Sequence, residues 1–166
     1  MKAIQLGCGL TGLVCAEHLA KNRNVEALTL ADIRTDGAEE LAGRLSNDKI
    51  SVEKVDARDG RALKRLMKDA DIVVSSISWM LNRKVMDVAL QTGTNYVDFS
   101  LTLDWDELDD PKKVHKDADI TILSCLGSDP GMTDVFARYS ADQLDQVDQI
   151  RTVSYTHLTL PTKRIV

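Results

Sequence analysis

Residues 7–12 read GCGLTG, and their three glycines stand in the pattern G-x-G-x-x-G. This pattern binds a pyrophosphate when a strand precedes it and a helix follows it. The first glycine permits a tight turn, the second lets the phosphates approach the backbone, and the third lets helix and strand pack closely. An apolar run at 2–6 precedes the pattern, and apolar residues at helical spacing follow it over 13–20. We therefore predict a dinucleotide site that includes Gly7, Gly9, Leu10, Thr11 and Gly12.

A carboxylate at the end of the next strand would complete this site. Asp32 ends the apolar run 27–32, and an acid about 20 residues after the glycines hydrogen-bonds the adenosine ribose in such sites. It would repel a 2′-phosphate, so we expect NAD as the cofactor. Arg34 follows closely and can pair with a 2′-phosphate, which makes NADP the alternative. A tight turn without any ligand is the structural alternative for the glycines.

Ligands of open parallel sheets bind beyond the carboxyl ends of the strands. Further strand-like runs end in small or acidic residues, which we expect at that edge. A purely structural role is the alternative for each, with Asp56 as a helix cap and the serines as small residues in a crowded strand end. The expected residues are Asp56 and Ala57 beside the adenine, Ser75, Ser76 and Ile77 near the nicotinamide ribose, and Asp98 and Ser100 at the fifth strand.

Strand-like and helix-like runs alternate along the chain, which predicts an α/β fold. We expect a Rossmann doubly wound parallel sheet of about six strands with helices on both faces. The run 71–77 is the most apolar and should be central, Asp36 and Glu39 should form a capping box, and Gly93 should end a helix. The expected strands are 2–6, 27–32, 50–57, 71–77, 95–100 and 119–127.

The composition excludes several function classes. The formal charge is −5, no basic run occurs, and aromatic residues make up 4%, so we expect neither nucleic acid nor a membrane as a partner. A strand begins at residue 2, which leaves no room for a signal peptide and predicts a cytoplasmic protein. Cys8, Cys15 and Cys125 lack metal-site spacing, so we expect reduced thiols and no metal. Cys8 is either a reactive thiol near a helix N-terminus or a variable loop position.

Several segments together resemble the saccharopine dehydrogenase-like family, over residues 2 to about 152. They are GCGLTG at 7–12, TLAD at 29–32, VDARD at 55–59, the run 73–100 and the run 127–150. Within that family the sequence is most similar to the lysine 6-dehydrogenases, with the saccharopine reductases next. The resemblance implies an NAD(P)-dependent amino-acid oxidoreductase acting on a CH–NH or CH–NH2 bond. Hydride leaves the carbon that bears nitrogen, and water hydrolyses the resulting imine.

The resemblance also implies roles for individual residues. Asp98 and the turn Asp129-Pro130-Gly131 would border the substrate pocket. The N–H groups of the turn would hold a substrate carboxylate, and Asp129 would face an ammonium group. A plain Asp-Pro-Gly turn is the alternative, and the catalytic proton-transfer residue is not identified. The residues carried over to the dinucleotide are Gly7, Gly9, Thr11, Gly12, Asp32 and Ile33.

The family pattern predicts three segments. Residues 1–145 form the dinucleotide-binding domain, and 146–152 begin a substrate and dimerisation domain whose remainder is missing. Residues 153–166, VSYTHLTLPTKRIV, resemble one reading frame of a transposase sequencing adapter, so we expect an artefact.

Two readings of function follow from this division. The fragment should bind dinucleotide without turnover, whereas the full-length protein should be a homodimer acting on a small amino acid. The alternative is a non-enzymatic NAD-sensing regulatory domain of the potassium-transport type. The segment 75–100 argues against that alternative, since a regulatory domain has no evident need for it.

Overall fold

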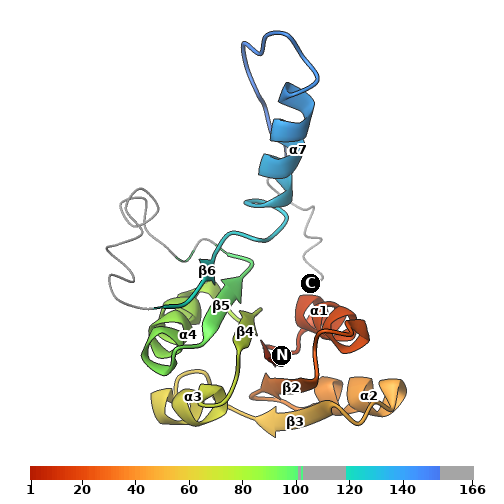
Figure 1. Ribbon diagram of the computed structural model, residues 1–166, viewed down its shortest axis with the longest axis vertical. Helices are drawn as coiled ribbons and strands as arrows, with labels where there is room; N and C mark the ends of the chain where they lie inside the picture. Colours follow the sequence, from red (N-terminus) through yellow and green to blue (C-terminus); the bar gives the residue numbers. More distant parts are fainter. Residues whose placement is uncertain (101, 103–118, 154–166) are drawn as a thin grey trace, which may run out of the picture.

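The computed structural model describes residues 1–100, 102 and 119–153. These residues form a six-stranded sheet with the strand order β3-β2-β1-β4-β5-β6, and every neighbouring pair of strands is parallel (Figure 1). This is the doubly wound Rossmann order, which confirms the predicted fold class. The tail 154–166 lies outside the described residues.

The elements follow the predicted alternation, although several strands are shorter than expected. The strands are β1 (Lys2–Leu6), β2 (Ala27–Asp32), β3 (Ile50–Lys54), β4 (Ile72–Ser75), β5 (Asn95–Asp98) and β6 (Ile122–Leu123). The helices are α1 (Leu10–Lys21), α2 (Asp36–Leu45), α3 (Gly60–Met67), α4 (Trp79–Thr92) and α7 (Met132–Ala141).

Two local expectations are wrong and one is confirmed. The strand expected over 119–127 has only two residues, because the chain leaves the sheet at Ser124 and Cys125 takes a φ of +65°. Asp36 is the first helical residue of α2, and Thr35 is the N-cap without a side-chain bond, so no capping box forms. Gly93 ends α4 in the left-handed conformation, as expected.

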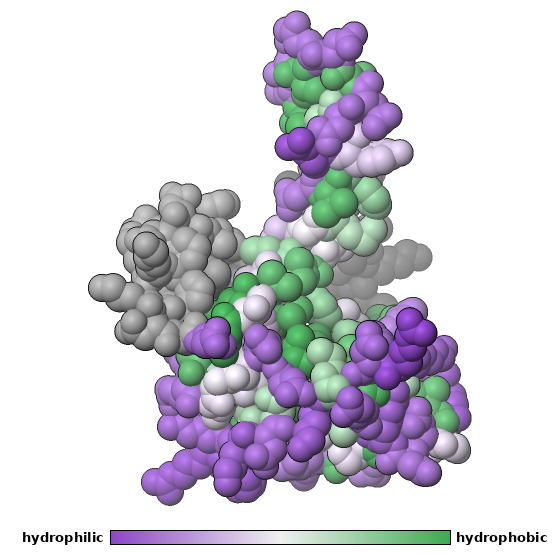
Figure 2. Space-filling model, in the orientation of Figure 1, coloured by the Kyte–Doolittle hydropathy of each residue, from purple (hydrophilic) through white to green (hydrophobic). Residues whose placement is uncertain are grey.

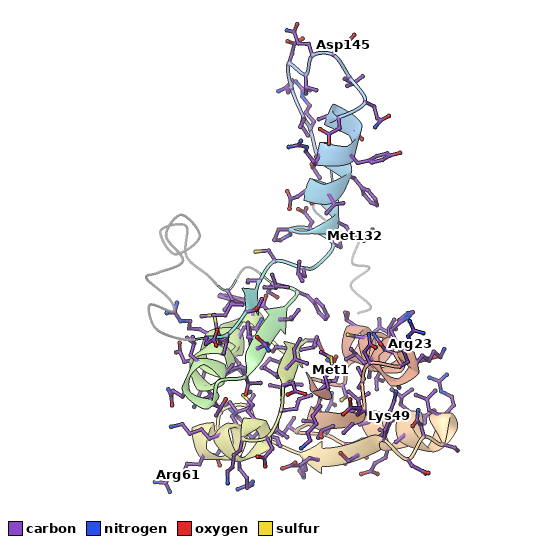
Figure 3. All side chains as sticks on the ribbon, in the orientation of Figure 1. Met1, Arg23, Lys49, Arg61, Met132 and Asp145 are labelled. Atoms are coloured by element: carbon purple, nitrogen blue, oxygen red, sulfur yellow. The ribbon has the colours of Figure 1, made fainter. Side chains whose placement is uncertain are left out.

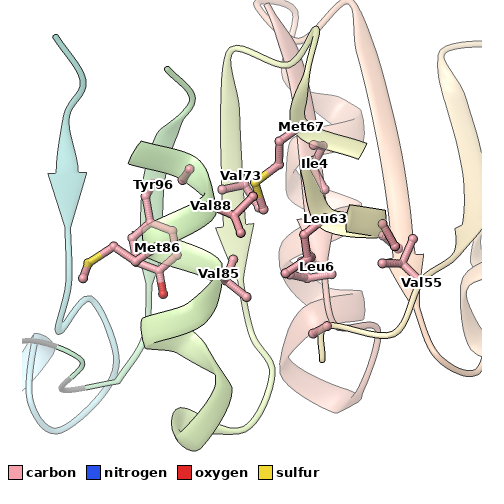
Figure 4. Packing of buried hydrophobic residues seen from close by; sticks show 14 residues of the cluster. Ile4, Leu6, Val55, Leu63, Met67, Val73, Val85, Met86, Val88 and Tyr96 are labelled. Carbon is pink, nitrogen blue, oxygen red and sulfur yellow. The ribbon is translucent and has the colours of Figure 1, made fainter. Parts of the chain in front are cut away.

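Apolar side chains fill both sides of the sheet. Residues from α3 and α4 pack on one face with Ile4, Leu6, Val73 and Tyr96 (Figure 4), and residues from α1 and α2 pack on the other. β4 lies inside the sheet between β1 and β5, as its apolar sequence predicted. Both faces of β1 and β4 are therefore covered, and β1 ends where the glycine loop begins.

The parallel register brings the carboxyl ends of the strands to one edge. Leu6 is opposite Ala31 on β2 and Ser75 on β4, and Ser75 is opposite Asp98 on β5. The glycine loop, Asp32, Ser75 and Asp98 consequently share this edge, where ligands of such sheets bind.

Helix α7 projects away from the sheet (Figure 1) and has no buried residue. Its side chains stand out from the ribbon between the labelled Met132 and Asp145 (Figure 3), and Figure 2 shows hydrophobic surface on this projecting part. Val135, Phe136 and Tyr139 are more than half exposed, at 65%, 57% and 68%. Residues 146–152, where a second domain was expected to begin, form neither a helix nor a strand.

Candidate functional site

The first and third glycines of the loop have no room for a side chain. Gly7 has a φ of +92°, and a Cβ there would lie 2.8 Å from Ile77 Cγ2. A Cβ on Gly12 would lie 2.0 Å from the Gly7 carbonyl oxygen and 2.5 Å from Ser76 Oγ. Packing within the protein therefore requires glycine at both positions.

Gly9 differs, because a Cβ there would meet nothing within 4 Å. The residue is exposed, and its backbone is the N-cap of α1 without a side-chain cap bond. Since the protein's own packing does not require this glycine, the open space beside it fits a ligand that approaches the backbone.

The first turn of α1 carries the positive end of the helix. The Leu13 N–H donates to the Gly9 carbonyl at 2.9 Å, which begins the helical ladder. The N–H groups of Leu10, Thr11 and Gly12 precede that bond and have no acceptor within the helix. No acidic residue stands in the first turn, so these N–H groups are suited to bind an anion.

Asp32 is fixed to the loop by backbone N–H donors. The Cys8 N–H donates to Asp32 Oδ2 at 2.6 Å, and the Arg34 N–H donates to Oδ1 at 2.9 Å. A carboxylate has about four acceptor positions, so both oxygens can still accept ribose hydroxyls. The Arg34 side chain is exposed at the same edge.

A pocket of about 260 Å³ opens beside Asp32. Most of its lining is aliphatic, which suits the flat apolar face of a purine ring. Sequence reasoning anticipated five of its residues and missed four. The predicted ones are Asp32, Ile33, Asp56, Ala57 and Ile77, and the missed ones are Leu6, Val55, Arg58 and Leu81.

Two residues that line this pocket, Asp56 and Arg58, form an ion pair. Arg58 donates from Nη2 to Asp56 Oδ2 at 2.8 Å and from Nε to Oδ1 at 3.0 Å. These bonds lower the pKa of Asp56 and keep it ionised. Asp59, not Asp56, caps α3 by accepting the N–H groups of Arg61 and Ala62, so the helix-cap alternative for Asp56 is wrong.

The two serines after β4 are used inside the protein. Ser75 is fully buried and donates to Asn82 Oδ1 at 2.8 Å. Ser76 is half-buried and donates to the Gly7 carbonyl at 2.8 Å. Ser75 is therefore not exposed at the sheet edge where a nicotinamide ribose was expected. Ser76 instead holds the glycine loop through its bond to Gly7.

Asp98 lies at the predicted strand end, but it faces the interior and is 0% exposed. Its carboxylate accepts bonds from Tyr96 Oη at 2.7 Å, Ser124 Oγ at 2.9 Å and the Ser100 N–H at 3.1 Å, and also from Thr102 Oγ1. Burial and the nearby Asp98 charge raise the pKa of Tyr96. In this arrangement Asp98 joins the end of β5 to the residues after β6, and a substrate does not reach it.

The turn before α7 uses two of its N–H groups within the chain. The Gly131 N–H donates to Asp134 Oδ2 at 3.0 Å, and the Met132 N–H donates to the Gly127 carbonyl at 3.0 Å. A substrate carboxylate would have to displace such bonds. Asp129 is exposed next to the half-buried Pro130 and accepts from Thr133 Oγ1 at 3.3 Å.

The Cys8 thiol is buried against the end of β2. Burial and then the Asp32 charge raise its pKa to about 11, so the thiolate is scarce at neutral pH. This disfavours the reactive-thiol reading of Cys8. Within the described ranges no group of three His, Cys, Asp or Glu residues is arranged to hold a metal ion, and no helix there is long and apolar enough to span a bilayer.

Comparisons with known proteins point to a shared nucleotide-binding domain. The family model for the saccharopine dehydrogenase NADP binding domain matches residues 3–123. Carboxynorspermidine synthase of Vibrio cholerae is 27% identical over 173 residues, covering 90% of this chain and 42% of that protein. Saccharopine dehydrogenase [NADP(+), L-glutamate-forming] of Saccharomyces cerevisiae is 28% identical over 139 residues, covering 84% of this chain and 30% of that protein.

The solved structures agree with this placement. Apo saccharopine dehydrogenase (L-Glu forming) from Saccharomyces cerevisiae superimposes with a TM-score of 0.70 at 26% identity, over 86% of this chain and 31% of that chain. The chain thus spans less than half the length of each of these relatives.

Proposed function

The chain belongs to the saccharopine dehydrogenase NADP-binding domain family, and we propose that it holds NAD for an oxidoreductase acting on a carbon–nitrogen bond of an amino acid. Membership of this family makes the chain a nicotinamide-dinucleotide-binding domain. The choice of NAD over NADP, the residues that bind the cofactor and the identity of the substrate are proposed here.

One observation carries the binding proposal, namely the 2.6 Å bond between the Cys8 N–H and Asp32 Oδ2. It ties the glycine loop to the carboxylate, so both halves of the dinucleotide fingerprint have a fixed relative position. The α1 N-terminus would receive the pyrophosphate, Asp32 would accept the ribose hydroxyls, and the pocket beside it would hold the adenine.

The same carboxylate supports NAD over NADP. A 2′-phosphate at the Asp32 position would bring two anionic groups together in a partly desolvated site, which is unfavourable. Arg58, a cation in the pocket lining, is paired with Asp56 through Nε and Nη2, so a 2′-phosphate would have to compete with that carboxylate for it. Arg34 is the remaining candidate cation at this edge.

Titration of the chain with NADH and NADPH, followed by cofactor fluorescence, tests this assignment. We expect tighter binding of NADH, and an Asp32→Ala variant should bring the two affinities closer together. Asp36→Ala is the matched control, because Asp36 is an exposed acid in the first turn of α2. Tighter binding of NADPH by the unmodified chain would overturn the NAD assignment.

The amino-acid substrate is proposed from the resemblance of residues 73–100 and 127–150 and from the names of the relatives. The bound nicotinamide would accept hydride from the carbon that bears nitrogen, leaving an imine for hydrolysis. Asp129 is the exposed acid at the substrate edge and would face the substrate ammonium group. Asp129→Asn in a full-length protein should weaken substrate binding, and unchanged binding and turnover would exclude this role.

Catalysis should require more than this chain. The relatives are more than twice as long, and in the described residues Asp98 and the 127–134 turn use their polar groups internally. We therefore expect dinucleotide binding without turnover, and we expect a full-length protein to be a homodimer by light scattering. Lysine-dependent NADH formation by this chain would contradict the first expectation. The family assignment disfavours the alternative of a regulatory NAD sensor.

A further inference from the structure

Gln5 is a buried polar residue in an apolar strand. It lies in β1 between Ile4 and Leu6, which both belong to the core, and it is 0% exposed. Its own side chain is on the opposite face of the sheet from theirs, because side chains alternate along a strand. A buried amide is costly unless its donors and acceptors are paired, so its partners indicate why it is there.

The Gln5 amide is bonded to the floor of the glycine loop. Its Nε2 donates to Ser76 Oγ at 2.8 Å and to the Gly7 carbonyl at 3.0 Å, and Ser76 Oγ donates to the same carbonyl at 2.8 Å. The three groups form a closed triangle. The Gly7 carbonyl oxygen can only accept a hydrogen bond. A flipped Gln5 amide would place its Oε1 against that oxygen, so the orientation of the Gln5 amide is determined.

This arrangement leaves part of the amide unsatisfied. Gln5 Oε1 has no hydrogen-bond partner among the described residues, although it is buried. An unpaired buried acceptor lowers stability, and an apolar side chain of similar size would avoid that loss. Core packing alone therefore does not account for glutamine at this position.

The triangle lies against the first turn of α1, where the pyrophosphate is proposed to bind. The Gly7 oxygen and Ser76 Oγ lie 2.0 Å and 2.5 Å from the place where Gly12 would carry a Cβ. They are thus wedged between the end of β1 and the first turn of α1. We propose that Gln5 is a positioning residue for the dinucleotide: with Ser76 it holds the Gly7 turn so that the α1 N–H groups are pre-aligned for the pyrophosphate. This inference rests on the proposed function.

The test separates binding from stability in the intact chain. Gln5→Leu removes both donors and the unpaired acceptor, so we expect an unchanged or higher Tm together with a Kd for NADH raised about tenfold. Thr29→Val is the matched control, because Thr29 on β2 pairs with Ser51 Oγ away from the loop. That control should leave the Kd unchanged.

A second variant protects the test against misfolding. Ser76→Ala removes the hydroxyl of the same triangle and should raise the Kd for NADH, and the effects of the two substitutions should not add in the double variant. A folded Gln5→Leu chain that binds NADH as tightly as the unmodified chain overturns the inference. If Gln5→Leu fails to fold, the Ser76→Ala variant decides the question, and unchanged binding of NADH by that variant overturns the inference. If the unmodified chain binds neither NADH nor NADPH, the proposed function itself fails, and this inference with it.

Discussion

Replacing Gly9 by alanine should weaken dinucleotide binding while leaving the fold intact. A Cβ at this position meets nothing within 4 Å, and its φ of −77° is open to any residue. Alanine is a poorer N-cap than glycine, which costs about 0.5–1 kcal/mol. The stiffer unfolded chain offsets about 0.4–1 kcal/mol of that loss. The net change in the free energy of unfolding should therefore stay within about 1 kcal/mol.

Gly12→Ala should differ by also destabilising the fold. Its Cβ would lie 2.0 Å from the Gly7 carbonyl oxygen, so the loop and α1 must separate by 1.4 Å to reach the 3.4 Å of an ordinary contact. Overpacking of this kind costs about 1–3 kcal/mol, or more where backbone must move. Gly43→Ala is the control, since it lies in α2 with open space around it. It should stabilise the chain by about 0.5–1 kcal/mol.

Thermal unfolding and NADH titration of the three variants check this reasoning. Gly9→Ala should keep its Tm and raise the Kd by about 10- to 100-fold, because the new methyl group would occupy the space of the phosphate. Gly12→Ala should lose stability and binding together, and Gly43→Ala should lose neither. A Gly9→Ala chain with unchanged affinity would show that no ligand approaches this glycine, and the geometry of the proposed site would then be wrong.

Three further predictions concern buried groups. Folded chain treated with iodoacetamide at pH 8 should remain unmodified at Cys8, whose pKa is about 11, and faster labelling there than at Cys125 by mass spectrometry would contradict this. The raised pKa of Tyr96 contributes stability below its unfolded value of about 10, and this stability is lost as the pH rises further. Phenolate absorbance at 295 nm from Tyr96 should therefore appear only with alkaline unfolding, and its appearance in the folded chain would contradict this. Asp98→Asn should lower the free energy of unfolding by about 2 kcal/mol in urea titrations, and a loss as small as that of the exposed Asp142→Asn would refute its bridging role.

Local sequence patterns were sufficient for the fold and for the glycine loop. The strand, the three glycines and Asp32 follow one another within a single β–α–β unit, so their spacing predicts their relative positions without knowledge of distant contacts. The structure adds the physical reason for each glycine. Gly7 and Gly12 are required by packing, whereas Gly9 is open to a ligand.

The direction of side chains at the strand ends could not be predicted in the same way. Ser75 and Asp98 are both at the expected edge, yet both face the interior. A strand places alternate side chains on opposite faces. Whether a side chain at the strand end is buried depends on residues far along the chain that pack over that face. Ser124, which donates to the Asp98 carboxylate from 26 residues away, is such a residue.

Gln5 was missed because it lies inside a short apolar run. A five-residue strand with buried neighbours is interpreted as part of the hydrophobic core. The pattern does not reveal that the Gln5 amide donates to the Gly7 carbonyl, two residues further along the chain. A single polar residue in a buried central strand is nevertheless a usable signal, because its cost demands a partner. That signal points to the adjacent glycine turn.

The polar groups at the carboxyl edge of the sheet differ in whether they are already satisfied. On the β1–β2 side, the first N–H groups of α1 have no helical acceptor, Asp32 retains acceptor capacity, and a pocket lies beside it. On the β5–β6 side, Asp98 and the N–H group of Gly131 are paired within the chain. A ligand on the first side replaces only water, whereas an anion at the turn must break bonds that already exist. We therefore expect the chain to bind a dinucleotide without rearrangement, and to bind an amino acid only after the turn before α7 changes its hydrogen bonds.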